Sequence, residues 1–568
     1  MDNSKCHNAQ KADYLCGADQ FGRAFMPVAG TNDKQVGMFY FLWHASDEKM
    51  TGTYNIAQLL AEHPDDLWNI QGTDLSPINR FYYWDEPLFG YYRSTDRWVI
   101  AKHIEMLTLA GVDFLYLDAT NAIPYLESCR ELFAILNDFC DAGKKAPKVA
   151  FYTNSRSIAT VTSIYNVLYT DPQYDRLWYR PDGVHPMIIG NCTVESDLAE
   201  AALRSDGGYR PEPLAKEIEE FFDIRQSQWP NEAYKPEGFP WMEWIYPQPV
   251  HSGVMNVSLA QHPQLPFSDS IKDRSRNMGR GYDFKNKKNV AEDARKGTNA
   301  QSQWDTVLAH KDEVHTVTVT GWNEWIAIKL ILEGRVFFVD TASEEFSRDI
   351  EPPRNGGYED AFYLQLCDNI RRFKGIEGEI ARPAKQAIDV GGDAAQWESV
   401  QSVYYSGCEK GYARNSSSVG NMYQYMQEAP RNNLRRIKAA DDGERLYFLV
   451  ENEKDFVSTD SADFVNIYIG TGTPGLKGWE SYEYVAVPSQ GKLYRLDSTG
   501  TRSDAGDIEV SIRGNKMQLA VRLSDIGKPD GIYFKAEDNV SSSNIMDTYT
   551  QGKCMPMGRL SWYYYLSE

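Results

Sequence analysis

The sequence lacks the motifs on which metal, nucleotide and serine chemistry usually depend. Its eight cysteines form no C-x-x-C pair, which excludes a zinc-ribbon framework and argues against a disulfide scaffold. It has no zinc-protease spacing of histidine and glutamate, no G-x-S-x-G elbow, no phosphate-binding loop and no dinucleotide fingerprint. We therefore expect no metal site and no other cofactor.

Long apolar runs and an excess of positive charge are also missing. No run of about 18 apolar residues occurs, so we expect no membrane span. The 59 Lys and Arg are outnumbered by 80 Asp and Glu, and the net charge is −21. We expect no nucleic-acid partner, because nucleic-acid binding depends on clustered positive charge. The first residues contain no apolar signal segment, which fits a cytoplasmic protein, or a secreted or periplasmic one that has lost a signal peptide. Nothing in the pattern predicts an oligomeric state.

The chain is long and rich in aromatic residues. At 568 residues it exceeds the size at which single cores stop growing, so more than one domain is expected. Aromatic residues make up 13% of the chain, with 35 Tyr and 14 Trp. We predict an N-terminal extension over residues 1–35 that packs on the main domain, a catalytic domain over 36–378, and a third domain over 379–568.

Strands and helices alternate through the second domain. A helix capped by Asp96 ends at Gly111, and a second helix ends at Gly143. This alternation predicts a parallel sheet with helical crossovers. We predict eight strands, at residues 36–44, 112–118, 148–154, 184–189, 221–226, 239–244, 253–259 and 316–321. Eight such strands predict an α/β fold, a (β/α)₈ TIM barrel, with a long polar loop over residues 262–300.

The third domain has a different period. Ile508, Val510 and Ile512 alternate with polar residues, Gly514 and Asn515 turn the chain, and residues 517–523 alternate again. A second hairpin is expected around Asp442-Gly443. We therefore predict an all-β antiparallel sandwich.

Polar and aromatic residues stand where the predicted barrel strands end. The carboxyl ends of barrel strands meet on the face where active sites form. Residues at these ends include Trp43, His44, Asp118, Asn154, Gln226, Glu243, Trp244, Asn256, Asn323 and Glu324. Carboxylates, amides and flat rings suit a neutral polyhydroxylated ligand, so we expect an oligo- or polysaccharide substrate.

Glu324 is the leading catalytic candidate. It follows the β-branched run 316–320 and stands between Trp322 and Trp325, whose rings are expected to raise its pKa. Glycosidic cleavage commonly needs two carboxyl groups, and Glu243 and Asp118 are the further catalytic candidates. The alternatives are that Glu324 closes the barrel mouth by hydrogen bonds and that Asp118 caps the loop after its strand through Asn121.

A wider set is predicted to contact the substrate. It consists of Tyr40, Trp43, His44, Asn154, Trp322, Asn323, Trp325, Arg348 and Glu351. His44 is equally well explained as a structural histidine. Arg348 is predicted either to bind an acidic or hydroxyl-rich group of the substrate or to form a salt bridge with Asp349 or Glu351.

Residues 321–325, Gly-Trp-Asn-Glu-Trp, with Ile350-Glu351-Pro352 after them, resemble a motif of the endo-α-mannosidase (glycoside hydrolase family 99) and WbsX-like group. Residues 39–43 resemble that group's first aromatic strand. The resemblance implies a (β/α)₈ barrel over roughly residues 35–375 that acts on glycosides, with Glu324 matching the first of two nearby glutamates. Ala327 stands at the second position, so Glu333, Glu351, Glu243 or Asp118 would have to supply the other carboxyl group.

The third domain resembles carbohydrate-binding modules of the family-nine, DOMON-like kind. The resemblance is carried by Ala387–Val390 with Trp397, and by Leu434–Asp442. It implies that Trp397, Trp479 and Trp562 either stack on sugars or are buried in the sandwich. Beside hydrolysis, three functions stay open: a glycosyltransferase, as the WbsX-like resemblance implies, a non-catalytic glycan-binding protein, and a lyase, for which His44 is the one prominently placed base.

Overall fold

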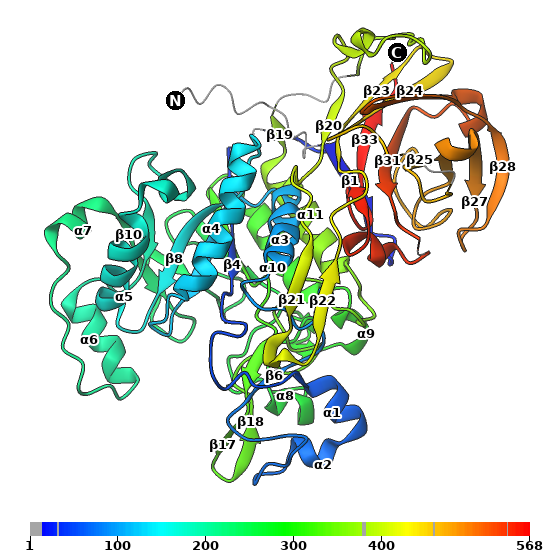
Figure 1. Cartoon of the computed structure of the whole chain (residues 1–568). Helices are drawn as coiled ribbons and strands as arrows, with labels where there is room; N and C mark the ends of the chain where they lie inside the picture. The colour runs from blue at the N-terminus through cyan, green and yellow to red at the C-terminus, as the bar shows by residue number, and fades with distance from the viewer. Residues whose placement is uncertain (1–13, 31–32, 378–381, 458–460, 542, 568) are drawn as a thin grey trace.

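The computed structural model describes residues 14–30, 33–377, 382–457, 461–541 and 543–567 (Figure 1). The predicted border between the second and third domains, at residues 378 and 379, lies outside these residues. Among the helices described, none is long and apolar enough to cross a membrane.

An eight-stranded parallel sheet forms the centre of the barrel. Its strand order is β11-β10-β9-β8-β7-β4-β15-β12, and β11 contacts β12, so the sheet is nearly closed. The strands are β4 (Gln35–Tyr40), β7 (Phe114–Ala119), β8 (Lys148–Thr153), β9 (Met187–Ile189), β10 (Asp223–Gln228), β11 (Gly238–Pro240), β12 (Val254–Ser258) and β15 (Thr316–Thr320). The predicted (β/α)₈ TIM barrel is confirmed.

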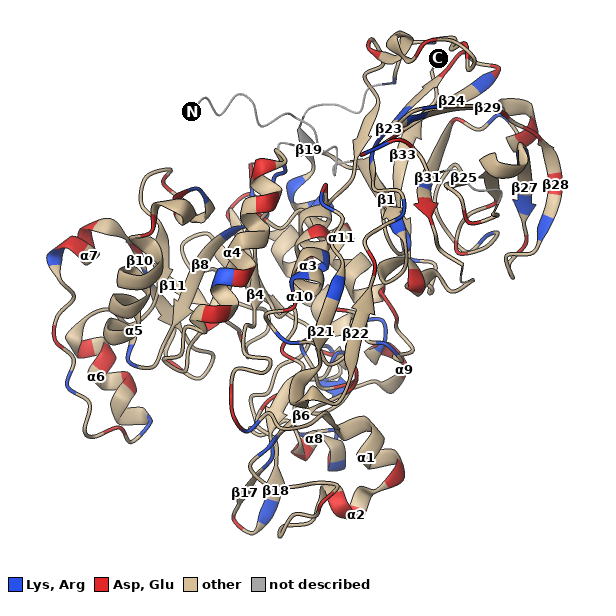
Figure 2. Ribbon diagram, viewed as in Figure 1, with Lys and Arg blue, Asp and Glu red and all other residues tan. Residues whose placement is uncertain are grey.

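Helices connect the strands and cover the sheet. They include α3 (Arg97–Ala110), α4 (Leu126–Asp141), α5 (Ser157–Ile164), α6 (Val194–Leu203), α7 (Lys216–Phe221), α10 (Thr298–Ala309) and α11 (Ala361–Lys374). The Asp96 carboxylate caps α3 by accepting from two backbone amides, and Gly111 follows the helix in the left-handed conformation, as predicted. Acidic side chains lie on the outer helices α4, α6 and α7 (Figure 2).

Shorter elements fill the loops at the ends of the strands. The stretch after β4 carries β5 (Tyr54–Asn55), α1 (Ile56–Glu62), α2 (Pro64–Leu67) and β6 (Phe81–Tyr83). The predicted loop 262–300 contains α8 (Asp269–Lys272), β13 (Tyr282–Asp283), β14 (Lys288–Asn289), α9 (Ala291–Ala294) and the start of α10. After β15 come β16 (Ile326–Ile328), β17 (Leu330–Leu332) and β18 (Arg335–Phe337).

Two strands end earlier than the sequence pattern predicts. β4 ends at Tyr40 and β11 at Pro240, so Trp43, His44 and Glu243 lie in loops beyond the sheet. At β4 the reason is a side chain: the Asn323 amide bonds both the backbone N–H and the backbone carbonyl of Phe41, at 3.0 and 3.2 Å. The Asn323 side chain therefore makes the two backbone hydrogen bonds that a neighbouring strand would otherwise make.

The C-terminal part contains two antiparallel sheets. One has the order β20-β23-β24-β30-β29, with β20 (Val403–Tyr405), β23 (Leu434–Asp441), β24 (Arg445–Asn452), β29 (Glu509–Arg513) and β30 (Lys516–Arg522). The other contains β25 (Asn466–Thr471), β26 (Tyr484–Val487), β27 (Lys492–Leu496), β28 (Arg502–Asp507), β31 (Gly531–Asp538), β32 (Lys553–Met555) and β33 (Leu560–Tyr565). Phe448 and Phe534 meet edge to face between the sheets, at 4.9 Å. The predicted antiparallel class and both hairpins are confirmed.

The N-terminal segment joins the C-terminal sheet. The sequence predicted an extension packed on the main domain. Arg23 does donate to the Lys296 carbonyl of the barrel, and in addition β1 (Leu15–Ala18) pairs antiparallel with β33 and with β2 (Ala24–Phe25). All four residues of β1 are buried. Four residues carry too little periodicity to predict a partner more than 500 positions away, so the pattern could not reveal this pairing.

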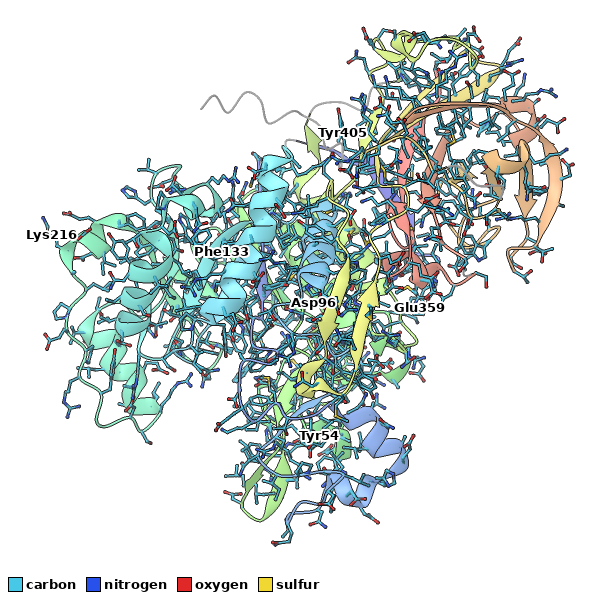
Figure 3. The ribbon with its side chains drawn as sticks, viewed as in Figure 1. Tyr54, Asp96, Phe133, Lys216, Glu359 and Tyr405 are labelled. Carbon is cyan, nitrogen blue, oxygen red and sulfur yellow. The ribbon has the colours of Figure 1, made fainter. Side chains whose placement is uncertain are left out.

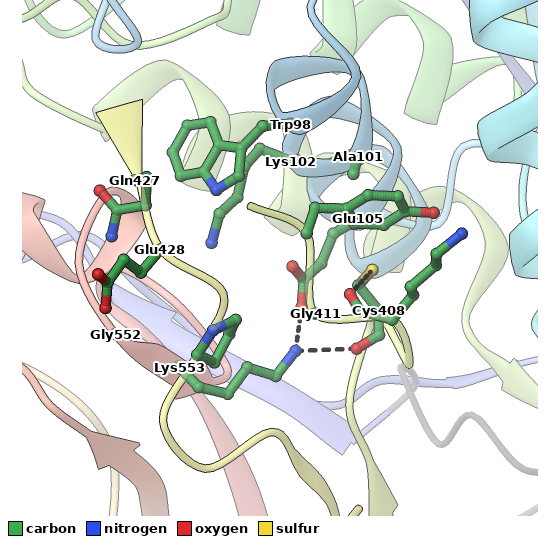
Figure 4. Close-up of a pocket in the computed structure, with 13 residues that line it drawn as sticks. Trp98, Ala101, Lys102, Glu105, Cys408, Gly411, Gln427, Glu428, Gly552 and Lys553 are labelled. Atoms are coloured by element: carbon green, nitrogen blue, oxygen red, sulfur yellow. Dashed lines mark hydrogen bonds and ion pairs between the residues drawn. The ribbon is translucent and has the colours of Figure 1, made fainter. Parts of the chain in front are cut away.

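Two further contacts join the C-terminal part to the barrel. A hairpin of β21 (Arg414–Ser417) and β22 (Gln424–Gln427) lies close to Asp96, at the start of α3 (Figures 1 and 3). A small pocket of about 30 Å³ lies between α3 and Lys553, whose ammonium approaches Glu105 and donates to the Cys408 carbonyl (Figure 4). It has room for about one water, so it is no substrate site.

Candidate active site

A cavity of about 420 Å³ opens where the barrel strands end, a size within the usual range for small-molecule sites. Loops after all of the barrel strands contribute to it. The lining includes Phe39, Phe41, Trp43, Asp118, Thr120, Asn121, Asn154, Glu200, Arg204, Trp229, Glu232, Trp241, Trp244, His262, Glu324 and Asp340.

Aromatic rings form much of the cavity lining. Trp229 and Trp241 meet edge to face at 4.6 Å, and Trp244 meets His262 at 5.4 Å. Trp43 stands nearer Glu324, and its indole N–H donates to the Glu324 backbone carbonyl at 3.2 Å. Such rings offer apolar faces against which the C–H faces of a sugar can pack.

Glu324 lies on the cavity wall just past β15 and is only 2% exposed. Asp349 holds this turn, because its carboxylate accepts hydrogen bonds from the backbone N–H groups of Glu324 and Trp325. The Trp84 indole donates to the same carboxylate at 2.7 Å. Burial raises the pKa of Asp349 to about 6, although these donors and Arg280 lower it.

Arg348 connects Glu324 to a second carboxylate. Its guanidinium donates to both Glu324 oxygens, at 2.5 to 2.9 Å, and the same terminal nitrogen donates to Asp340 Oδ1 at 3.1 Å. Since one nitrogen bonds Glu324 Oε2 and Asp340 Oδ1, these two oxygens are at most 5.6 Å apart. The other terminal nitrogen donates to His262 Nδ1 at 2.8 Å.

The environments of these groups differ. Burial raises the pKa of Glu324 well above its ordinary value, and Arg348 opposes that rise. Burial and the charge of Arg348 lower the pKa of His262, so a neutral imidazole accepts from the guanidinium. The Asp340 side chain is 31% exposed, which leaves it far better hydrated than Glu324.

Asp118 and Asn154 lie on the polar side of the cavity. Asp118 Oδ1 accepts from the backbone N–H and the hydroxyl of Thr120, at 3.0 and 2.7 Å, so Asp118 does cap the loop, but through Thr120 and not through Asn121. Burial raises the pKa of Asp118. The Asn154 amide donates to Glu200 at 3.2 Å.

Trp322, Asn323 and Trp325 do not line the cavity. Trp322 packs against His103 in the core, and Trp325 stacks on Trp84 at 4.8 Å. The Asn323 amide is used by the Phe41 backbone. The indoles beside Glu324 in sequence are therefore core residues, and the rings near Glu324 in space come from other loops.

Five other predicted site residues also lie outside the lining: Tyr40, His44, Glu243, Arg348 and Glu351. The Tyr40 hydroxyl bonds His103 at 2.9 Å, and His103 bonds the buried Glu351 at 3.0 Å. His44 is buried, and burial lowers its pKa to about 3. Glu243 pairs with His251 at 2.7 Å. Tyr40, Glu243 and Glu351 are thus bonded to other buried side chains, and Arg348 contacts the cavity residues Glu324 and Asp340.

Several cavity residues were not predicted, chiefly Asp340, Trp229 and Trp241. Asp340 closes the apolar run Phe337–Val339, the same pattern that singled out Asp118, and could have been found by it. Trp229 directly follows β10, but the predicted strand ended two residues too early. Of the alternatives for a second carboxyl group, Glu333 is exposed in the β17–β18 turn and Glu351 is buried away from the cavity.

The three tryptophans of the third domain differ in their surroundings. Trp397 and Trp562 are buried, each 1% exposed. Trp479 lines a separate cavity of about 360 Å³ together with Tyr468 and Arg502. Glycan binding by this part of the chain stays a prediction.

No protein-family model matches the chain, and no curated protein does. Among solved structures, it is similar to the GH99 endo-α-mannosidase of Bacteroides thetaiotaomicron, at 15% identity with a TM-score of 0.35, covering 61% of this chain and 98% of the other. A structure of such an enzyme with bis-tris-propane gives 15% identity and a TM-score of 0.33, covering 60% of this chain and 98% of the other. Similarities this low carry no argument about activity.

Proposed function

We propose that the protein is a glycoside hydrolase that cleaves a glycosidic bond in an oligo- or polysaccharide, with Glu324 and Asp340 as its pair of carboxyl groups. One observation carries the proposal: two carboxylates share a single guanidinium on the wall of an aromatic cavity at the strand ends of a (β/α)₈ barrel. Paired carboxyl groups are the usual machinery of glycosidic cleavage.

The difference in burial assigns the two roles. Glu324 is buried, and its raised pKa suits a group that holds a proton and donates it to the leaving oxygen. Asp340 is more exposed and acts as the ionised partner. Its oxygen bonds the anomeric carbon as the glycosidic C–O bond breaks and the Glu324 proton passes to the leaving oxygen. Water, deprotonated by Glu324, then releases the sugar and restores both groups.

The spacing favours retention of configuration at the anomeric carbon. An upper limit of 5.6 Å between the nearest oxygens fits the roughly 5–5.5 Å typical of retaining enzymes better than the roughly 6.5–9.5 Å of inverting ones. Glu243 and Asp118, the other predicted catalytic residues, take different roles: Glu243 binds His251, and Asp118 faces the substrate as a binding group.

A glycan panel tests this proposal. The wild-type protein is incubated with diverse oligo- and polysaccharides, and released reducing ends are measured beside Glu324→Gln and Glu105→Gln. Glu105 is a suitable control because it is a buried glutamate paired with Lys553, outside the cavity. We expect turnover of at least one glycan, a loss of about 10²–10⁴-fold in Glu324→Gln, and little change in Glu105→Gln. No turnover of any glycan, or full activity of Glu324→Gln, contradicts hydrolysis.

A second candidate function is glycan binding without cleavage. The observation that favours it is that Arg348 makes three hydrogen bonds to Glu324, which occupies a carboxylate that catalysis needs. In that case the protein binds a glycan from the panel, measured by calorimetry, and releases no product.

A further inference from the structure

The innermost polar groups of the cavity carry more negative than positive charge. Asp118, Asp340 and Glu324 all line it, and Arg348 is the cation that bonds two of them. Arg204, also in the lining, is occupied by Glu200 and Asn121. This leaves Asp118 without a cation at hydrogen-bond distance among the residues that the structure describes.

Asp118 is incompletely bonded for a buried carboxylate. It is 4% exposed, and both of its hydrogen bonds, from Thr120, go to Oδ1. Within the described chain, Oδ2 receives no hydrogen bond, and the residue lines the cavity. A buried carboxylate with no cation at hydrogen-bond distance and without a full set of donors is costly, so a ligand that supplies both gains binding energy there.

We propose that the substrate carries a protonated amine that pairs with Asp118, so that the sugar bound in this cavity is an amino sugar with a free ammonium group. The inference rests on the proposed function, because it takes this cavity as the substrate site. A hydroxyl would also bond Asp118, but a hydrogen bond from a charged donor is about twice as strong. A sugar carboxylate or sulfate would be repelled by the ionised Asp118 and Asp340.

Neighbouring groups are placed to bind the rest of such a sugar. Thr120, Asn121 and Asn154 flank Asp118 with hydroxyl and amide groups that can bond ring hydroxyls. Trp43 and Trp241, also in the lining, offer rings to the C–H face and, when the amine is close, a cation–π contact.

The test is calorimetric binding of D-glucosamine, D-galactosamine, their N-acetylated forms and D-glucuronate to the full-length protein at neutral pH. N-acetylation removes the charge and keeps the ring. We expect one or both free amines to bind at least tenfold more tightly than the acetylated form, and glucuronate not to bind. Asp118→Asn should abolish that preference and leave the melting temperature near that of the wild type. Glu232→Gln, which changes a cavity carboxylate already paired with Lys235, should retain it.

Equal affinity for free and acetylated sugars, tighter binding of glucuronate, no binding of any of these sugars, or an unchanged preference in Asp118→Asn would overturn the inference. Its failure is separable from that of the proposed function. Loss of turnover in Glu324→Gln without any amine preference refutes only the amine inference. An amine preference in a protein that cleaves no glycan refutes only hydrolysis.

Discussion

At the residue scale, Asp340 is the side chain on which the account depends most after Glu324. If Asp340 bonds the anomeric carbon, Asp340→Asn should lower kcat by at least about 10³-fold on any substrate. A substrate with a more reactive leaving group should not restore the rate, because the nucleophile is still missing. The fold should persist, since Asp340 is partly exposed and makes a single ion pair. Circular dichroism and steady-state kinetics measure both. Activity within tenfold of the wild type would exclude this role.

Asp349 should make the stability of the protein depend on pH. Its pKa in the folded protein is about 6, above the ordinary value of 3.8, so its contribution is fully present below about pH 4 and lost as the pH rises through 6. Relative to Asp349→Asn, the wild-type protein should lose about 2 kcal/mol of unfolding free energy between pH 4 and 7. Denaturant unfolding at several pH values measures this. A difference that is constant with pH would contradict it.

The residues beside Glu324 mark how far local sequence could predict the site. Glu324 itself was predicted because a β-branched strand ends just before it. The rings near it were not, because Trp322 and Trp325 turn into the core while Trp43, Trp229 and Trp241 arrive from other loops. Sequence spacing indicates which strand ends in a polar residue. It does not indicate which way each side chain turns after the strand stops.

At the element scale, the β21–β22 hairpin holds a loop that reaches the site. Arg414 donates to the Asp96 carboxylate at 2.8 Å and to the Phe89 carbonyl at 2.9 Å, and it lies over the Tyr425 ring. The same loop carries Tyr92, whose hydroxyl donates to Glu351 and accepts from Asn323. The hairpin therefore supports the turn in which Glu324 lies.

Arg414→Met should lower the unfolding free energy by about 3–5 kcal/mol, because it leaves the Asp96 charge buried without its partner. It should also lower kcat, through movement of the Tyr92 loop. Arg445→Met is the matched control, since Arg445 pairs with Glu509 at the surface and should cost less than about 1 kcal/mol. Equal losses in the two variants, measured by denaturant unfolding, would show that the hairpin contact stabilises the protein no more than a surface ion pair does.

At the scale of the whole molecule, the strand–helix alternation was enough to predict the barrel, and the change to a period of two was enough to predict the C-terminal sheets. Both patterns are local and repeat over many residues. The pairing of β1 with β33 was beyond such reasoning, because it joins the two ends of the chain through four residues. The docking of the β21–β22 hairpin was missed for the same reason.

The β1–β33 pairing predicts that the C-terminal sheets need the N-terminal strand. A fragment of residues 382–568 leaves the β33 edge and its buried side chains uncovered, and such an edge promotes aggregation. We expect this fragment to be aggregated or only partly folded, and fusion of residues 14–30 to it to restore a cooperative melting transition. Gel filtration and circular dichroism compare the two. A monomeric, cooperatively folding fragment without residues 14–30 would contradict the prediction.

The central claim is that Glu324 gives a proton to the leaving group, and a comparison of two substrates tests it most directly. The kcat/KM of Glu324→Gln is measured on the natural glycan and on a dinitrophenyl glycoside of the same sugar, whose leaving group needs no proton. The account predicts a loss of about 10²–10⁴-fold on the glycan and less than about tenfold on the activated glycoside. Equal losses on both substrates, or full activity on the glycan, would contradict it.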